Sequence, residues 1–322
     1  MFNDHINIDD EISYCVSTEI FKIKTKIEVQ KFTKKSSLVP DIDKHYVFDE
    51  KTTVSILQGL KHNKKVLVQG LHGTGKSTHI EQIAARLNWP CIRINLDSHI
   101  SRFDLLGKDA IVLKEGKQIT TFKDGVLPWS IKNPVILVLD EYDAGRPDVM
   151  FVIQRILESE GKLTLLEQNK VIKPHKFSRI FATSNTVGLG DTAGIYHGTQ
   201  QINQGQLDRW NIVTTLNYLK PEIEEKIISK KVKDFYINNK KNVSQMVNLA
   251  NLTREGFKNA DISVLMSPRT TLSWAENSVY FNNIDLAFQL SFFNKCEEND
   301  QLIINEYYQR CFGREILGYE AF

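Results

Sequence analysis

The most chemically informative feature of the sequence is a glycine-rich run that ends in a lysine and a hydroxyl residue, Gly70-Leu71-His72-Gly73-Thr74-Gly75-Lys76-Ser77. It matches the phosphate-binding pattern G-x4-G-K-[ST] at every fixed position. Glycines let successive backbone N–H groups turn inward, and a following helix N-terminus adds positive potential, so such a loop cradles a polyphosphate. The run therefore predicts binding of a nucleoside triphosphate, ATP, with Mg²⁺. Its expected nucleotide-binding residues are Gly70, His72, Gly73, Thr74, Gly75, Lys76, Ser77 and Thr78.

The residues on either side of the loop supply the context that the pattern requires. The run from Lys65 to Gln69 is typical of a buried strand, and Thr78 to Leu87 is typical of a helix. In this context we expect Lys76 to reach the β- and γ-phosphates and the Ser77 hydroxyl to ligate Mg²⁺.

A second apolar run, Pro134 to Leu139, ends in two carboxylates, Asp140 and Glu141. We expect Asp140 to help hold Mg²⁺ through its water shell and Glu141 to polarise the water that attacks the γ-phosphate. A third strand-like run, Arg179 to Thr183, leads to Asn185, whose amide can help to position that water. An Asn at the start of a loop is also common for purely structural reasons.

Two arginines are candidates for stabilising charge during phosphoryl transfer. Arg209 follows Asp208 shortly before an expected fifth strand, and Arg269 lies near the start of an expected helix with Ser267 as its N-cap and Pro268 in its first turn. An arginine from a neighbouring subunit can neutralise the transition-state charge in such sites. Lone arginines are usually surface residues, so the pattern alone does not assign these roles.

The expected strands alternate with helical segments, which predicts an α/β fold with a parallel sheet covered by helices on both faces. The strands are expected at 66–69, 91–96, 135–139, 179–183 and 212–216, and helical periodicity from Glu222 to Arg310 predicts a small all-α domain. The expected domains are an N-terminal segment at 1–45, an ATPase core at 46–218 and a helical lid at 219–322. Two hairpins are expected within the core, at 110–122 and 162–173.

The N-terminal segment contains one alternating run, Phe21 to Val29, which predicts a half-buried strand with a solvated lysine face. The overall composition is that of an ordinary globular protein, with 41% hydrophobic and 25% charged residues. A net charge of +2 argues against a general nucleic-acid binder. We expect a cytoplasmic protein, because no apolar run suggests a signal peptide or a membrane span and the four cysteines lack metal-ligand spacing.

The chain resembles AAA+ ATPases in four features. These are the phosphate loop, the Asp-Glu pair at a strand end, the Asn after a further strand and the two arginines. The two hairpins resemble those of the branch that holds MoxR-like proteins and magnesium-chelatase ATPase subunits. More narrowly, residues 38–312 resemble CobS-type AAA+ subunits of aerobic, ATP-dependent cobaltochelatases. That resemblance is carried by three continuous blocks, His72 to Gln82, Asp140 to Phe151 and Tyr196 to Trp210.

The resemblance implies a homo-oligomeric ring, expected to be a hexamer. In it, Lys76, Ser77, Asp140, Glu141, Asn185 and Arg269 serve the subunit's own nucleotide, while Arg209 acts on the neighbour's, with Arg146 as a second candidate for that contact. It further implies two partners, a large chelating subunit and a subunit with an adhesion-type metal site. Together they insert Co²⁺ into hydrogenobyrinic acid a,c-diamide during cobalamin biosynthesis.

Two other functions stay open from the sequence. One is a MoxR-like chaperone that activates another metalloenzyme, and the other is a nucleic-acid translocase, which the near-neutral charge disfavours.

Overall fold

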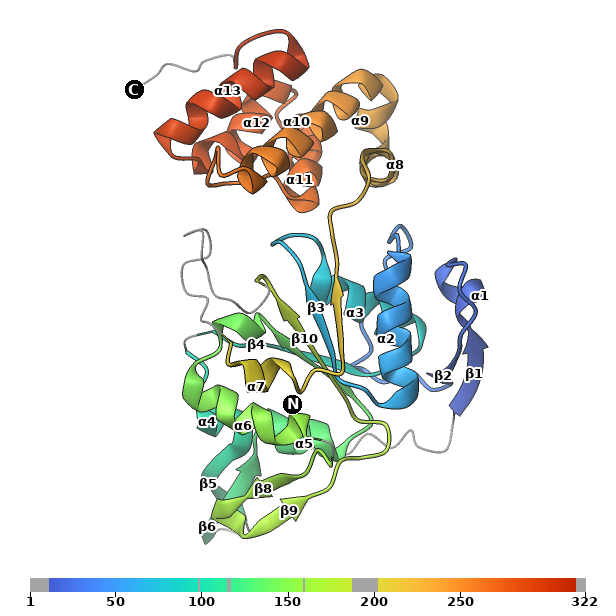
Figure 1. Ribbon diagram of the computed structural model, residues 1–322, viewed down its shortest axis with the longest axis vertical. Coiled ribbons are helices and arrows are strands. Elements are labelled where there is room, and N and C mark those ends of the chain that lie inside the picture. Colours follow the sequence, from blue (N-terminus) through green and yellow to red (C-terminus); the bar gives the residue numbers. More distant parts are fainter. Residues whose placement is uncertain (1–11, 98, 115–116, 159, 187–201, 317–322) are drawn as a thin grey trace. The chain divides into compact units, whose positions relative to one another are not determined.

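The computed structural model describes residues 12–97, 99–114, 117–158, 160–186 and 202–316. By their contacts the residues form two compact units that divide between Leu216 and Asn217, with the short segments 44–47 and 72–74 grouped with the second. The first unit combines strands and helices, and the second consists of helices (Figure 1). The α/β fold class with an additional helical region is therefore confirmed.

A five-stranded parallel sheet forms the centre of the first unit, in the order β11-β3-β10-β7-β4. All five strands were expected from the sequence, and each end lies within one residue of its expected place. Their bounds are Val66–Gln69 (β3), Cys91–Asn95 (β4), Ile136–Asp140 (β7), Arg179–Ser184 (β10) and Ile212–Thr215 (β11).

Alternating side chains of the sheet contribute to two separate apolar cores. Val66 and Val68 pack with α2 (Glu50–His62) and α3 (Lys76–Arg86), whereas Leu67 packs with α4 (Arg102–Leu106), α5 (Val126–Lys132) and α6 (Pro147–Leu157). Successive side chains of a strand point to opposite faces, so these helices cover the sheet on both sides (Figure 1). This double burial explains why the strands read as continuous apolar runs.

Both expected hairpins are present. Strand β5 (Gly107–Lys114) pairs antiparallel with β6 (Lys117–Asp124), and β8 (Leu163–Leu165) pairs antiparallel with β9 (Lys170–Ile172) through the short helix η2 (Leu166–Gln168). Figure 1 shows them at the lower end of the first unit.

The expected strand over Phe21 to Val29 is wrong in position. The structure instead has β1 (Ile12–Val16), α1 (Ser17–Phe21) and β2 (Glu28–Phe32), with β1 and β2 paired antiparallel. Between α1 and β2 the chain forms a loop, in which Lys22 adopts a left-handed conformation with φ 56°.

Two polar side chains stabilise this loop, although the alternation of apolar and polar residues suggests a strand. The Ser17 hydroxyl donates to the Thr25 carbonyl at 2.7 Å and accepts from the Ile27 N–H at 2.8 Å. One carboxylate oxygen of Glu50 accepts from the N–H groups of Lys24 and Thr25 at 3.1 Å. The loop therefore buries its apolar residues while side chains, and not a neighbouring strand, bind its backbone. The periodicity of the sequence does not distinguish such a loop from a strand.

The second unit contains the helices expected after Glu222, together with the short helix η3 (Phe293–Lys295). Their bounds are Pro221–Lys231 (α8), Lys233–Asn238 (α9), Lys240–Lys258 (α10), Pro268–Tyr280 (α11), Ile284–Ser291 (α12) and Glu298–Phe312 (α13). Ser267 is the N-cap of α11, as expected, and its hydroxyl accepts from the Thr270 N–H. Within the described ranges, no helix is both long and apolar enough to cross a bilayer.

The N-terminal hairpin is part of the core, because Phe32 is buried against Trp89 and Phe177 with ring centroids 5.0 and 5.7 Å away. We expect Phe32→Ala to lower the free energy of unfolding by about 3–5 kcal/mol through the cavity that it leaves. Chemical denaturation measures this change. Tyr14→Ala is the control, since Tyr14 is 63% exposed on the same hairpin and its loss should cost less than about 0.5 kcal/mol. Equal effects of the two substitutions would contradict this packing.

Candidate active site

Several of the expected site residues lie where three neighbouring parallel strands end. Asp140 is the last residue of β7, Asn185 follows the last residue of β10, and Gly70 follows β3. In the sheet, β10 lies between β3 and β7, with Ser184 opposite Gln69 and Ala182 opposite Leu139. The carboxyl ends of parallel strands share one edge of the sheet, so these residues gather there.

The glycine-rich loop connects β3 to α3. Gly73 and Gly75 have φ values of 71° and 87°, in the left-handed region that glycine adopts without strain. Gly75 is the N-cap of α3 and has no side chain to cap the helix. The first N–H groups of α3 are therefore available to bind an anion, as in other phosphate loops.

Lys76 is the first residue of α3, and its side chain turns back along the loop. Its ammonium group donates to the carbonyls of Gly70 and Leu71 at 2.8 and 3.0 Å and to the Asn185 amide oxygen at 2.8 Å. Lys76 is only 7% exposed. Burial lowers the pKa of Lys76 to about 8, although the nearby carboxylates of Asp140, Asp143 and Glu141 act in the opposite direction. A buried cation with mainly neutral partners is well prepared for an anionic ligand.

The Asp140 carboxylate joins four structural elements. Its Oδ1 accepts from the Ser77 hydroxyl at 2.5 Å and from the Thr183 hydroxyl, while its Oδ2 accepts from Arg93 Nε at 2.7 Å. Asp140 is 4% exposed, so these partners supply the hydrogen bonds that water does not. The ligand atoms that Ser77 and Asp140 offer are all oxygens, which Mg²⁺ prefers. Mg²⁺ bound there would neutralise charge on the phosphates of ATP.

Arg93, in β4, was not expected from the sequence to belong to the site. Its guanidinium also forms an ion pair with Asp140 at 2.5 Å and lies 3.7 Å from the Glu81 carboxylate in α3. The sequence offered only a polar residue between Ile92 and Ile94. Its role follows from the sheet, in which β4 lies beside β7.

Glu141 adopts a left-handed backbone conformation, with φ 55° and ψ 47°. Its N–H donates to the Thr183 hydroxyl at 3.2 Å, and the chain then turns into the short helix η1 (Tyr142–Ala144). This conformation is unfavourable for a residue with a Cβ atom, and such strain is concentrated at functional sites. Within the described residues no partner binds its carboxylate, which suits a base that must meet a water molecule.

Asp143 is a second residue that the sequence did not indicate. Its Oδ2 accepts from the N–H groups of Asn185 and Thr186 at 3.0 and 2.8 Å and from the Thr186 hydroxyl at 2.9 Å. These bonds fix the backbone that carries the Asn185 amide. Asp143 therefore links the strand end that holds Glu141 to the one that holds Asn185.

Arg209 and Arg146, the two candidates for a contact with a neighbouring subunit, have partners other than the residues of the phosphate site. Arg209 follows α7 (Gln204–Leu207) and donates to the Gly205 carbonyl, and its guanidinium lies 3.9 Å from the Glu158 carboxylate. When the side-chain amide of Gln154 in α6 is oriented with its oxygen toward Arg209, that oxygen accepts a hydrogen bond from the guanidinium at 2.9 Å. Arg146 forms a half-exposed ion pair with Asp148 at 3.1 Å.

The structure thus brings together Lys76, Ser77, Asp140, Glu141 and Asn185, but not Arg209 or Arg146. Arg269, the second residue of α11, is exposed in the second unit. Part of the third sequence block, 196–201, lies outside the described residues.

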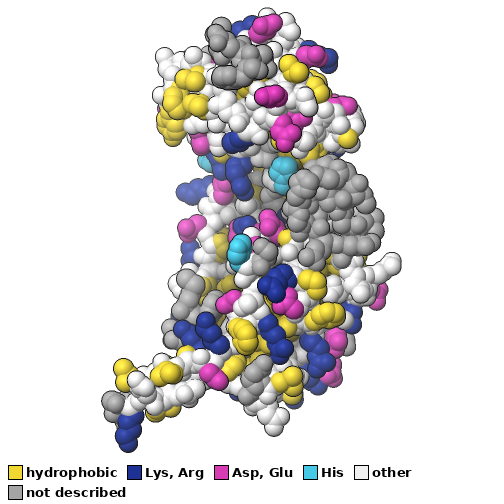
Figure 2. All heavy atoms as spheres, turned by 90° about the vertical axis from the view of Figure 1, so that its left-hand side faces the viewer, with side chains coloured by type: hydrophobic (Ala, Val, Ile, Leu, Met, Phe, Trp, Pro, Cys, Tyr) yellow, Lys and Arg dark blue, Asp and Glu magenta, His cyan; other side chains and the backbone are white. Residues whose placement is uncertain are grey.

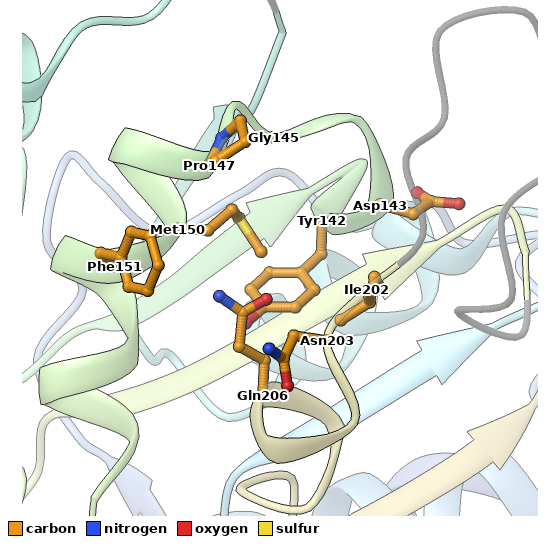
Figure 3. Close-up of a pocket in the computed structure, with 9 residues that line it drawn as sticks. All are labelled: Tyr142, Asp143, Gly145, Pro147, Met150, Phe151, Ile202, Asn203 and Gln206. Atoms are coloured by element: carbon orange, nitrogen blue, oxygen red, sulfur yellow. The ribbon is translucent and has the colours of Figure 1, made fainter.

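A cavity of about 190 Å³ lies beyond Glu141, lined by residues that include Tyr142, Met150, Asn203 and Gln206. Figure 3 shows these four side chains directed toward one another, while the Asp143 carboxylate points away from them. Tyr142 is fully buried with its ring edge-on to Trp210, and burial raises the pKa of Tyr142 to about 12. In the described part of the chain, no group of three or more His, Cys, Asp or Glu side chains is arranged to hold a metal ion.

The lowered pKa of Lys76 predicts how ATP affinity depends on pH. Below about pH 8 the free ammonium group is charged and affinity is constant. Above it, binding requires protonation of Lys76, because bound phosphates favour the charged form, so affinity should fall by up to about tenfold per pH unit. Titration of a fluorescent ATP analogue from pH 7 to 9.5 measures this. In Lys76→Arg the guanidinium stays charged and the slope should disappear; equal slopes in the two proteins would contradict the assignment.

Comparison with known families gives one match that covers half of the chain. Residues 65–234 match the model of the AAA domain, dynein-related subfamily. The matched range contains the phosphate loop, the Asp-Glu strand end, Asn185 and Arg209.

Among curated proteins, the aerobic cobaltochelatase subunit CobS of Sinorhizobium sp is 60% identical over 299 residues, which cover 92% of this chain and 90% of the relative. Midasin of Dictyostelium discoideum is 30% identical over 47% of this chain, but the match covers only 3% of midasin. An uncharacterized protein of Staphylococcus saprophyticus is 27% identical over 57% of this chain and 67% of its own length. With AAA-domain residues gathered at one sheet edge and such identity along nearly the whole chain, the protein belongs to the AAA ATPases and, within them, to the CobS family of aerobic cobaltochelatase subunits.

Proposed function

We propose that this protein is the ATP-hydrolysing motor subunit of a cobaltochelatase, in which ATP turnover drives the insertion of Co²⁺ into hydrogenobyrinic acid a,c-diamide during cobalamin biosynthesis. The observation that carries this proposal is the 60% identity to a CobS subunit over 92% of the chain. Co²⁺ and the corrin are substrates of the whole complex. The alternative of a MoxR-like chaperone for another metalloenzyme has no comparable support.

The geometry suggests how the chain's own residues take part in hydrolysis. Lys76 exchanges its carbonyl partners for the phosphates of ATP, while Ser77 and Asp140 supply oxygen ligands for Mg²⁺. Glu141 orients the attacking water and takes its proton, and the Asn185 amide, fixed through Asp143, helps to place that water. By family resemblance, Arg269 serves the same nucleotide.

The remaining element is an arginine supplied by a neighbour. The described contacts of Arg209 are with α7, with α6 and with Glu158 directly after α6. None of them is with Lys76 or Asp140, which favours a role outside its own subunit's site. A head-to-tail interface that places Arg209 at the next subunit's nucleotide closes into a ring when its rotation permits. We therefore propose a homo-oligomeric ring, a hexamer by family resemblance, acting with a large chelating subunit and a subunit that carries an adhesion-type metal site in the cytoplasm.

Mixing two inactive variants tests the shared site. Glu141→Gln should bind ATP but lose turnover, because an amide cannot take the proton of the water. Arg209→Ala should keep ATP affinity and lose hydrolysis by a factor on the order of 10³–10⁵. Mixed rings should recover activity, since some interfaces pair an intact Glu141 with an intact Arg209. Hydrolysis is measured after sedimentation shows assembled rings. Assembled mixtures that stay inactive would rule out Arg209 as the trans residue and make Arg146 the next candidate.

The complex itself is tested by cobalt insertion. The purified chain is combined with the chelating and adhesion-type subunits of the same organism, ATP, Mg²⁺, Co²⁺ and the corrin, and the cobalt corrin is followed by its absorption. Insertion should require this chain and should be lost with Glu141→Gln. The Glu141→Gln protein is the matched control, since it keeps the surface of the chain and removes only turnover. Insertion at the same rate without the chain, or with the inactive variant, would overturn the proposed function.

A further inference from the structure

A buried ion pair in the helical unit connects α8 to α10. Arg254 and Glu224 have side chains that are only 3% and 2% exposed. Their contact is bidentate, with Arg254 NH1 donating to Glu224 Oε2 at 2.8 Å and NH2 donating to Oε1 at 2.9 Å. The cost of removing two charges from water can exceed what their contact returns, so a buried pair is weak evidence for stability and can instead serve to fix position.

The rest of the guanidinium is bound as well. Arg254 Nε donates to the Met266 carbonyl at 2.8 Å, and NH1 also donates to the Asn251 amide oxygen at 3.0 Å. The Tyr218 ring lies against one face, with its centroid 4.5 Å from the guanidinium carbon. Arg254 therefore has a single defined orientation, which Glu224 sets from α8.

The contact with Met266 connects this pair to the start of α11. The preceding residue of α10, Thr253, accepts from the Met266 N–H at 3.0 Å and donates to the Ala250 carbonyl at 2.8 Å. Both backbone polar groups of Met266 are thus held by neighbouring side chains of α10. Three residues before Met266, Ser263 is fixed to Asp300 of α13 by its N–H and its hydroxyl, the latter at 2.6 Å.

Little freedom remains between Met266 and Arg269. Ser267 caps α11 through the Thr270 N–H, and the ring of Pro268 restricts its own φ angle. The backbone position of Arg269 therefore follows from that of Met266, which in turn follows from Arg254.

We propose that Arg254, oriented by Glu224, is a positioning residue that sets the place of Arg269 during ATP hydrolysis. This inference rests on the proposed function, in which Arg269 serves the subunit's own nucleotide. Displacement of a catalytic group by about 1 Å can cost on the order of 100-fold in rate, so the connection from α10 to α11 would directly influence turnover.

The test separates positioning from general stabilisation. Arg254→Met combined with Glu224→Leu removes both charges and fills the space with apolar groups, an exchange that often preserves stability. We expect its Tm to change by only a few degrees, while kcat for ATP hydrolysis falls on the order of tenfold or more, as it should in Arg269→Ala. Arg314→Met is the matched control, because Arg314 binds the buried Asp285 in the same unit but not Met266, and its kcat should not change.

The deciding measurement adds Arg269→Ala to the double substitution. If Arg254 acts through Arg269, the combined variant should be no slower than Arg269→Ala alone, whereas independent effects would multiply. Multiplied losses, or normal kcat in the folded double variant, would overturn the positioning role and leave the proposed function intact. An Arg269→Ala protein with normal kcat and ATP affinity would instead overturn the role of Arg269 and this inference with it.

A smaller change gives the same test if the double variant does not fold. Thr253→Val keeps the shape of the side chain and removes the hydroxyl, which accepts from the Met266 N–H and donates to the Ala250 carbonyl one turn back in the same helix. Its kcat should fall about severalfold in the native background and remain unchanged in the Arg269→Ala background. A loss of equal size in both backgrounds would contradict the proposal.

Discussion

The carboxylate of Asp140 is the constraint on which the site depends. It is almost fully buried, and its hydrogen-bond donors come from α3, β10 and β4. Such a carboxylate is stable only where all of these elements deliver their donors to one point. The strand order, with β7 between β10 and β4, meets that requirement. The same sheet therefore determines both the fold and the site, because it buries the apolar strands and brings together the hydrogen-bond donors that the Asp140 carboxylate needs.

Of the charged groups around this point, Lys76 can exchange its partners, whereas Arg93 and Asp143 hold neighbouring groups in place. Lys76 is held by two carbonyls and an amide, which are weaker partners than a phosphate group. Arg93 binds Oδ2 of Asp140 and Ser77 binds Oδ1, so Arg93 secures the carboxylate without occupying the oxygen that Ser77 binds. Asp143 uses one oxygen to fix the backbone at Asn185 and Thr186. Much of the site is consequently held in place by contacts within the chain itself, which lowers the cost of reorganisation during turnover.

The sequence predicted those features that depend on neighbouring residues along the chain. Apolar runs located all five strands, turn residues located both hairpins, and Ser267-Pro268 located the start of α11. The failure at Phe21 to Val29 has a physical reason, since Ser17 and Glu50 stabilise a loop with the alternation of a strand. Arg93, Asp143 and Arg254 could not be found in this way. Their partners lie 47, 42 and 30 positions away, and only the fold brings them together.

In both units an arginine binds a buried carboxylate where a residue must be held in a defined position. In the first unit Arg93 fixes Asp140, and in the second Glu224 fixes Arg254, which holds the residue before the cap of α11. An apolar contact tolerates small shifts, whereas a bidentate guanidinium–carboxylate pair restricts both distance and orientation. In a motor whose ATP site is completed by an arginine from another subunit, as proposed for Arg209, each subunit must present its own half of the site with little variation. Directional contacts of this kind supply that precision at a cost in stability that apolar packing elsewhere offsets.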